Sequence, residues 1–141
     1  MMPRLSADTA LAAAWIVALA ASLAVLFIGE VLGQRPCVLC WYQRAFMFPL
    51  AVILGLGLWW GDRTIGRYGI ALALAGGAFA LWHLGLFAGI VPEPIQPCTA
   101  SGPSCTDDKQ LVLGVPIPLL SLLAFALIAA LSAASLTETD R

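Results

Sequence analysis

Four cysteines are the residues of this 141-residue chain with the clearest capacity for chemistry. Cys37 and Cys40 form a C-x-x-C motif, whereas Cys98 and Cys105 are separated by six residues. A free cysteine usually behaves as a small buried hydrophobe, yet none of these four lies in the middle of an apolar segment. Three interpretations fit this pattern: two structural disulfides, a zinc site of four thiolates, or exchange between dithiols and disulfides.

The first pair belongs to the segment CVLCWYQR, residues 37–44, in which aromatic residues and a cation follow the second cysteine. We expect a helix to begin near Cys40 or Trp41, so that helix N–H groups and the positive end of the dipole favour a thiolate at Cys40. Arg44 follows four residues later, one helical turn along the same face. Its cation could stabilise that thiolate and negative charge on a docked molecule. Alternatively, its head could simply reach water from the edge of the membrane.

A redox pair also needs an electron acceptor. The sequence has no NAD or flavin fingerprint, and the motif stands between long apolar runs, so a lipid-soluble quinone is the economical choice. Cys40 would donate to the quinone ring, and Arg44 would offset charge on the reduced oxygen. His83, the one histidine, falls in the outer half of an expected helix near the depth of Arg44. It could contact the quinone or serve as a hydrogen-bonding residue within the helix bundle.

The composition places these residues in a membrane protein. Hydrophobic residues make up 61% of the chain and charged residues 11%, against about 25% charged residues in soluble domains. Four windows without charge approach or exceed the ~20 residues that cross a ~30 Å hydrocarbon layer. We therefore expect an all-α membrane protein, a four-transmembrane-helix bundle in one domain over residues 1–141. The expected helices cover residues 10–31, 41–60, 66–91 and 115–136.

The first apolar window could instead be a secretory signal, since Arg4 precedes it. The window is longer than the roughly 7–15 residues of a signal core. In addition, Glu30 and the sequence GQR at residues 33–35 make a poor cleavage site. The sequence therefore favours a retained first helix.

Two short loops, rather than a soluble domain, would carry the cysteines. Two expected helices separate Cys40 from Cys98, so all four cysteines emerge on one side of the membrane. The positive-inside rule favours cytoplasmic N- and C-termini. Arg4, Arg63, Arg67 and Arg141 are then inside, and Arg35, Arg44 and Lys109 are outside. The cysteine loops become extracytoplasmic, where disulfides persist. A net charge of -1 with no basic run argues against nucleic acid as a partner.

Two segments carry a family resemblance. CVLCWYQRAFMFPL, residues 37–50, and VPIPLLSLLAF, residues 115–125, resemble the DsbB family of quinone-dependent, disulfide-generating membrane proteins. They are most similar to its short-loop branch, the disulfide formation protein C type. Because the four helices and two cysteine pairs also follow the family's order, the resemblance covers nearly the whole chain.

The resemblance implies a role for each cysteine. Cys37 and Cys40 would be the quinone-coupled pair, with Cys40 meeting the quinone. Cys98 and Cys105 would exchange with a soluble DsbA-like thioredoxin-fold oxidase, whose thiolate attacks Cys98. A transient link between Cys37 and Cys105 would pass the electrons between the pairs.

The resemblance also implies the cofactor, ubiquinone or menaquinone, with Arg44 as the quinone-side cation. His83 lies near a histidine that the family has at the quinone site. The second outer loop departs from the longer-loop members because it has only about 17 residues. We therefore expect a smaller contact with the soluble partner.

These observations predict an enzyme of the bacterial inner membrane. It would reoxidise a soluble thiol oxidase, reduce membrane quinone and so support disulfide formation in exported proteins. One alternative is a vitamin K epoxide reductase-like protein, although those usually carry C-x-x-C at a late helix. The other is a non-catalytic membrane scaffold with loop disulfides or zinc.

Overall fold

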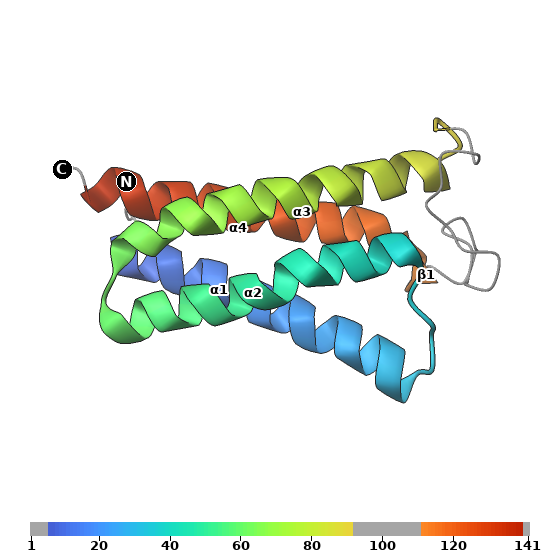
Figure 1. Cartoon of the computed structure of the whole chain (residues 1–141), viewed down its shortest axis with the longest axis horizontal. Helices are drawn as coiled ribbons and strands as arrows, with labels where there is room; N and C mark the ends of the chain where they lie inside the picture. The colour runs from blue at the N-terminus through green and yellow to red at the C-terminus, as the bar shows by residue number, and fades with distance from the viewer. Residues whose placement is uncertain (1–5, 92–110, 140–141) are drawn as a thin grey trace.

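Four long helices form a bundle along one axis in the computed structural model, which describes residues 6–91 and 111–139 (Figure 1). The helices are α1 (Ala7–Leu26), α2 (Val38–Trp60), α3 (Gly66–Phe87) and α4 (Ile117–Thr139). A π-helical turn, η1 (Phe27–Val31), continues α1, and a 3₁₀ turn, η2 (Arg63–Ile65), precedes α3. Each helix is long and apolar enough to cross a membrane. The expected all-α membrane fold with four helices is confirmed.

Some helix ends differ from those expected from the sequence. α2 begins at Val38 rather than residue 41, because Cys37 has an extended backbone and serves as the N-cap. α3 ends at Phe87 rather than residue 91. Gly89 there adopts a positive φ of 75°, and its N–H bonds back to the carbonyl of Leu86, which closes the helix. The charge-free windows predict the number of helices but not the residues at which each helix begins and ends.

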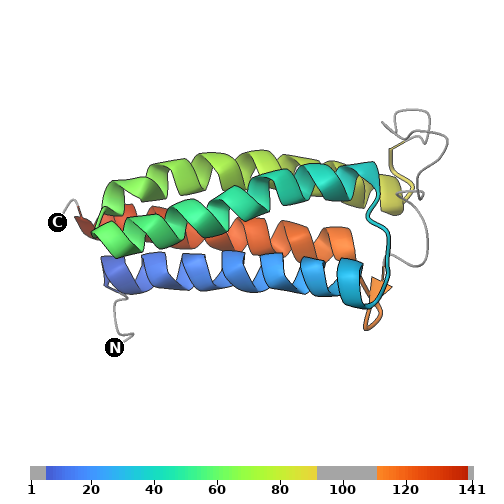
Figure 2. The ribbon, with the colours of Figure 1, turned by 60° about the horizontal axis from the view of Figure 1, so that its bottom comes forward.

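A short hairpin precedes α4, where the sequence suggested helix from residue 115. β1 (Leu111–Val112) pairs antiparallel with β2 (Val115–Pro116). Leu113 and Gly114 form the turn between them, and both have positive φ, as a tight two-residue hairpin turn requires. The hairpin lies at the same end of the bundle as the link between α1 and α2 (Figure 2).

Small residues let the helices approach closely. A Cβ on Gly69 of α3 would lie 3.0 Å from Ser132 Oγ of α4, and a Cβ on Gly76 would collide with the Phe125 ring. The main buried cluster fills the centre of the bundle with Leu11, Ala14, Ala18, Met47, Leu50, Leu54, Ala73, Ala80, Phe125 and Ile128. Membrane helices associate through such close packing, because lipid tails are as apolar as leucine.

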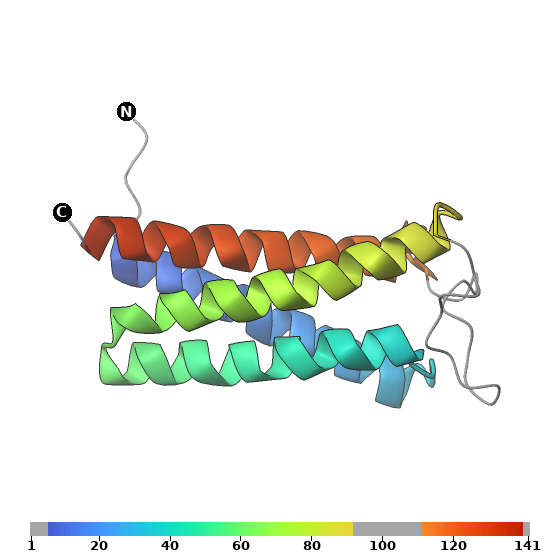
Figure 3. The same ribbon diagram turned by 45° about the horizontal axis from the view of Figure 1, so that its top comes forward.

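The two ends of the bundle differ in chemistry. The beginning of α1, the turn between α2 and α3 and the end of α4 lie together at one end (Figure 3). There Arg63 binds Asp8 with both guanidinium contacts at 2.8 Å, which ties η2 to the first turn of α1. The beginning of α2, with Cys37 and Cys40, lies at the opposite end (Figure 1).

Candidate active site

The cysteine pair lies at the N-terminus of α2. Cys37 is the N-cap, and Cys40 lies in the first turn. Pro36, whose fixed φ and missing N–H suit an extended link, immediately precedes the cap. The two sulfur atoms are 3.2 Å apart, against about 2.05 Å in a disulfide. A small side-chain movement would therefore bring the two sulfurs to the distance at which oxidation can join them.

The two cysteines have different surroundings. Cys37 is fully buried and packs with Leu39 and Leu86 in a small apolar cluster. Cys40 is half-buried and lines a cavity on the other side of the α2 terminus. One sulfur thus faces the protein interior, and the other faces a space that a small molecule could enter.

His83 of α3 contacts the buried cysteine. Its Nε2 lies 3.7 Å from Cys37 Sγ, and its ring is fully buried. Its Nδ1 lies 2.9 Å from Nε2 of Gln43, a buried side chain on α2. A neutral imidazole has one donor and one acceptor nitrogen. When the Gln43 amide donates to Nδ1, the ring proton is on Nε2 and faces Cys37.

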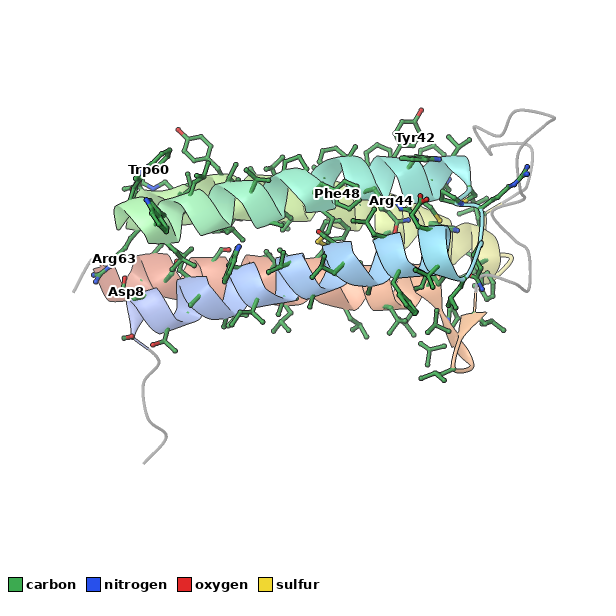
Figure 4. The ribbon with its side chains drawn as sticks, turned by 90° about the horizontal axis from the view of Figure 1, so that it is seen from below. Asp8, Tyr42, Arg44, Phe48, Trp60 and Arg63 are labelled. Carbon is green, nitrogen blue, oxygen red and sulfur yellow. The ribbon has the colours of Figure 1, made fainter. Side chains whose placement is uncertain are left out.

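Arg44 lies between α2 and the end of α1 (Figure 4). Its side chain is only 9% exposed, and its Nη2 donates to the carbonyl oxygen of Val25 at 3.0 Å. The guanidinium carbon lies 5.2 Å from the centre of the Trp41 ring, a cation–π distance. The C-terminal end of α1 carries the negative end of that helix's dipole and so favours a cation here. These contacts hold Arg44 at the cavity rather than in the surrounding water.

The cavity lies between α1, α2 and α4 and has a volume of about 200 Å³. Its polar lining includes Cys40, Gln43 and Arg44 on α2, and most of the remaining lining is apolar. An apolar cavity of about 150 Å³ is enough to bind benzene. The space therefore suits a six-membered ring, with a sulfur and a guanidinium on its wall. His83 is not among the described residues that line it.

The structure thus brings together Cys37, Cys40, Arg44 and His83, while Cys98 and Cys105 fall outside the described residues. The sequence interpretation missed Gln43. The signal was available, because residues 40, 43, 44 and 47 follow the i, i+3, i+4, i+7 spacing of one helix face, and a polar residue on such a face needs a partner. The same helix turn can hold a ring near Cys40 and Arg44, or a metal ion between the thiols and His83.

Comparison with known proteins gives the family. The family model described as disulfide bond formation protein DsbB matches residues 7–135. A probable disulfide formation protein from Metapseudomonas resinovorans is 55% identical over 83% of this chain and 82% of its own length. A protein of the same name from Deinococcus radiodurans is 42% identical over 88% and 86%. Disulfide bond formation protein C of Bacillus subtilis is 39% identical over 82% and 84%.

No solved structure gives a significant match to the chain. The family assignment therefore rests on sequence, and the match extends over all four helices of the bundle. Because the relatives also align over more than four-fifths of this chain, it belongs to the DsbB family of disulfide bond formation proteins.

Proposed function

We propose that this protein is a quinone-dependent thiol oxidoreductase that reoxidises a soluble DsbA-like thioredoxin-fold oxidase. The observation that carries the proposal is the shared position of Cys40 and Arg44 on the wall of an apolar cavity large enough for a ring. The names of the relatives, disulfide formation proteins, support the same class of reaction. Disulfide bonds in exported proteins would be the final product.

The four cysteines would act in sequence. The partner's dithiol reduces a Cys98–Cys105 disulfide by exchange, and a thiolate of that pair then attacks Cys37. This attack breaks a Cys37–Cys40 disulfide, releases Cys40 as a thiolate and leaves Cys37 in a mixed disulfide. The second thiolate of the outer pair then displaces Cys37, which re-forms the Cys98–Cys105 disulfide and leaves both electrons on Cys37 and Cys40. The helix N-terminus and Arg44 stabilise the leaving thiolate, which speeds exchange. Each turnover removes two electrons and two protons from the partner.

The cavity and its cation would deliver those electrons to the membrane. Ubiquinone or menaquinone, when bound, accepts two electrons and two protons. Cys40 provides the sulfur that faces the cavity, and Arg44 offsets negative charge that develops on a ring oxygen beside it. The apolar lining keeps water away from the sulfur, which strengthens this electrostatic effect.

His83 has a different place in the proposal from the one expected from sequence. Its expected contact with the quinone stays a prediction, and its described contacts are with Cys37 and Gln43. We propose that His83 holds or supplies a proton at the Cys37 sulfur during exchange. Gln43 keeps the ring oriented toward that sulfur.

The orientation is also a proposal. With both termini cytoplasmic, the end of the bundle that holds Cys37 and Cys40 faces the extracytoplasmic space, where a soluble oxidase operates. The inner membrane of a bacterium provides both this oxidising side and the quinone pool.

The central test uses purified protein in lipid nanodiscs, with quinone reduction driven by a reduced thioredoxin-fold oxidase. Cys40→Ser should abolish quinone reduction, because the sulfur that faces the cavity is lost. Trp60→Phe, an exposed change at the opposite end of the bundle, should keep the native rate. An unchanged rate in Cys40→Ser would end the proposal. Disulfides that quinone does not re-form after reduction would instead support a non-catalytic scaffold.

A further inference from the structure

We propose that the reduced Cys37–Cys40 pair and His83 form a binding site for a thiophilic divalent cation, Zn²⁺. The site would exist only in the dithiol form and would block reoxidation while it is filled. The binding site stands on the geometry of three side chains, whereas its regulatory meaning rests on the proposed function. Zinc would thus act as a redox-gated inhibitor of the reduced enzyme.

The positions of the three ligand atoms carry the inference. The two sulfurs and a ring nitrogen of His83 all lie within 4.8 Å of one another. Tetrahedral zinc with Zn–S of about 2.3 Å and Zn–N of about 2.0–2.1 Å requires S···S near ~3.8 Å and S···N near ~3.6 Å. The observed distances are 3.2 Å between the sulfurs and 3.7 Å from Cys37 Sγ to His83 Nε2. The third pair, the Cys40 sulfur and the ring nitrogen, lies within 4.8 Å, so side-chain shifts of about 1 Å or less would complete three corners of the tetrahedron.

Gln43 provides the outer contact that a histidine ligand needs. Ligation through Nε2 requires the ring proton to be on Nδ1, where it must find an acceptor. The Gln43 amide already lies 2.9 Å from Nδ1, and rotating it by half a turn presents its oxygen. The hydrogen bond therefore survives when Nε2 turns from a donor to Cys37 into a metal ligand.

Binding is a substitution without electron transfer. One Zn²⁺ forms two Zn–S bonds, and up to two protons leave the thiols for solvent. In the disulfide form both sulfurs are held in the S–S bond, so no thiolate remains to bind the ion. Cys40 is half-buried beside the cavity, which gives the ion a route to an otherwise buried site.

Zinc binding and electron transfer would use the same electron pairs on the two sulfurs, so one process excludes the other. A Cys40 thiolate that is bound to zinc cannot donate to a ring in the cavity, and a bound Cys37 cannot exchange. The fraction of the reduced protein that holds zinc is therefore withdrawn from turnover.

The test uses the full chain with Cys98→Ser and Cys105→Ser, which leaves Cys37 and Cys40 as the only thiols. Zinc affinity is measured by competition with a chromophoric chelator, on protein reduced with a phosphine and on protein oxidised with diamide. The reduced form should bind one Zn²⁺, and the oxidised form should bind none at this site. Diamide keeps the binding result independent of quinone chemistry.

Two variants and one control locate the site. His83→Gln should weaken zinc binding more than about 100-fold, and Gln43→Leu about 10- to 100-fold, as for outer contacts of other metal sites. Each variant is checked for two titratable thiols and a native elution profile. Glu30→Gln removes an exposed carboxylate from η1, the turn that continues α1, and should leave the affinity unchanged. Equal binding to reduced and oxidised protein, or unchanged affinity in both variants, would overturn the site.

A single-turnover experiment connects the site to function. Reduced Cys98→Ser/Cys105→Ser protein is mixed with quinone, with and without prior Zn²⁺, and the quinone absorbance is followed. The amplitude of the fast phase should fall in proportion to the zinc-bound fraction. Quinone reduction that ignores bound zinc would overturn the regulatory inference and leave the proposed function standing. Zinc binding in a protein that never reduces quinone would refute the proposed function and leave the metal site standing.

Discussion

At the scale of single residues, the first turn of α2 gives its two cysteines opposite partners. Cys37 faces His83 on α3, and Cys40 faces the cavity with Arg44. The three-residue spacing keeps the sulfurs 3.2 Å apart despite this division. A C-x-x-C motif at a helix terminus can therefore serve two different neighbours, because one cysteine lies on the cap and the other in the turn.

Removing the cation tests the quinone side of this arrangement. Arg44→Met should lower kcat/KM for quinone about 10- to 150-fold, since a hydrogen bond to a charged group contributes about 1.5–3 kcal/mol. Arg63→Met makes the same substitution at the opposite end of the bundle, where the cation pairs with Asp8. It should leave kcat/KM unchanged. The measurement is steady-state quinone reduction, and an equal kcat/KM in Arg44→Met and the native protein would contradict the role of Arg44.

At the scale of the elements, α3 packs closely on α4 where two glycines of α3 face Phe125. Gly76 of α3 lies under the ring of Phe125, while a methyl group added at neighbouring Gly77 would have only Phe125 Cβ nearby, at 3.6 Å. Two adjacent glycines on one helix therefore face the same partner with different clearance. That difference allows a matched comparison in which the chemical change is identical.

Gly76→Ala should destabilise the bundle, because its new methyl group collides with a ring that packing holds in place. We expect the free energy of unfolding to fall by about 1–3 kcal/mol, typical of an overfilled core. Gly77→Ala makes only an ordinary contact and should be neutral or slightly stabilising, since alanine favours helix. Unfolding in mixed detergent measures both. Equal stability of the two variants would show that the interface yields to the extra group.

Sequence reasoning reached the number and order of the helices because charge-free windows report membrane spans directly. It also singled out Cys37, Cys40, Arg44 and His83, whose residue types are rare in apolar segments, and their functional roles stay a prediction. It did not find the contact between Gln43 and His83, because that contact depends on the rotation of α2 relative to α3. The hairpin before α4 was also not predicted. Leucine seldom adopts a positive φ, so Leu113 gave no sign of the turn that it forms.

At the scale of the whole molecule, the bundle separates two polar ends along its long axis. One end has the Arg63–Asp8 pair, and the other has the cysteine pair and the β1–β2 hairpin. A chemical label could be attached at either end. Thr64 in η2 lies at one end, and Leu113 in the hairpin lies at the other and is 100% exposed. The fold thus provides a direct test of orientation.

Thr64→Cys and Leu113→Cys, each in a chain whose native cysteines are replaced by serine, should differ in labelling. The experiment uses intact cells whose outer membrane has been made permeable to the reagent. A maleimide that cannot cross the inner membrane should label Leu113→Cys and not Thr64→Cys. After lysis both should react, which controls for the intrinsic reactivity of each thiol. Labelling in the reverse order would show that the bundle is inserted with the cysteine pair facing the cytoplasm.

The separation of Cys37 from the cavity has a consequence for the order of events in turnover. A ring beside Cys40 occupies the space between α1, α2 and α4, whereas Cys37 lies against α3. In the proposed reaction, the quinone and the thiol that attacks Cys37 would therefore not compete for the same volume. We then expect both reactants to be bound at once, so that electrons from the aqueous side can be accepted before the previous product diffuses away into the lipid.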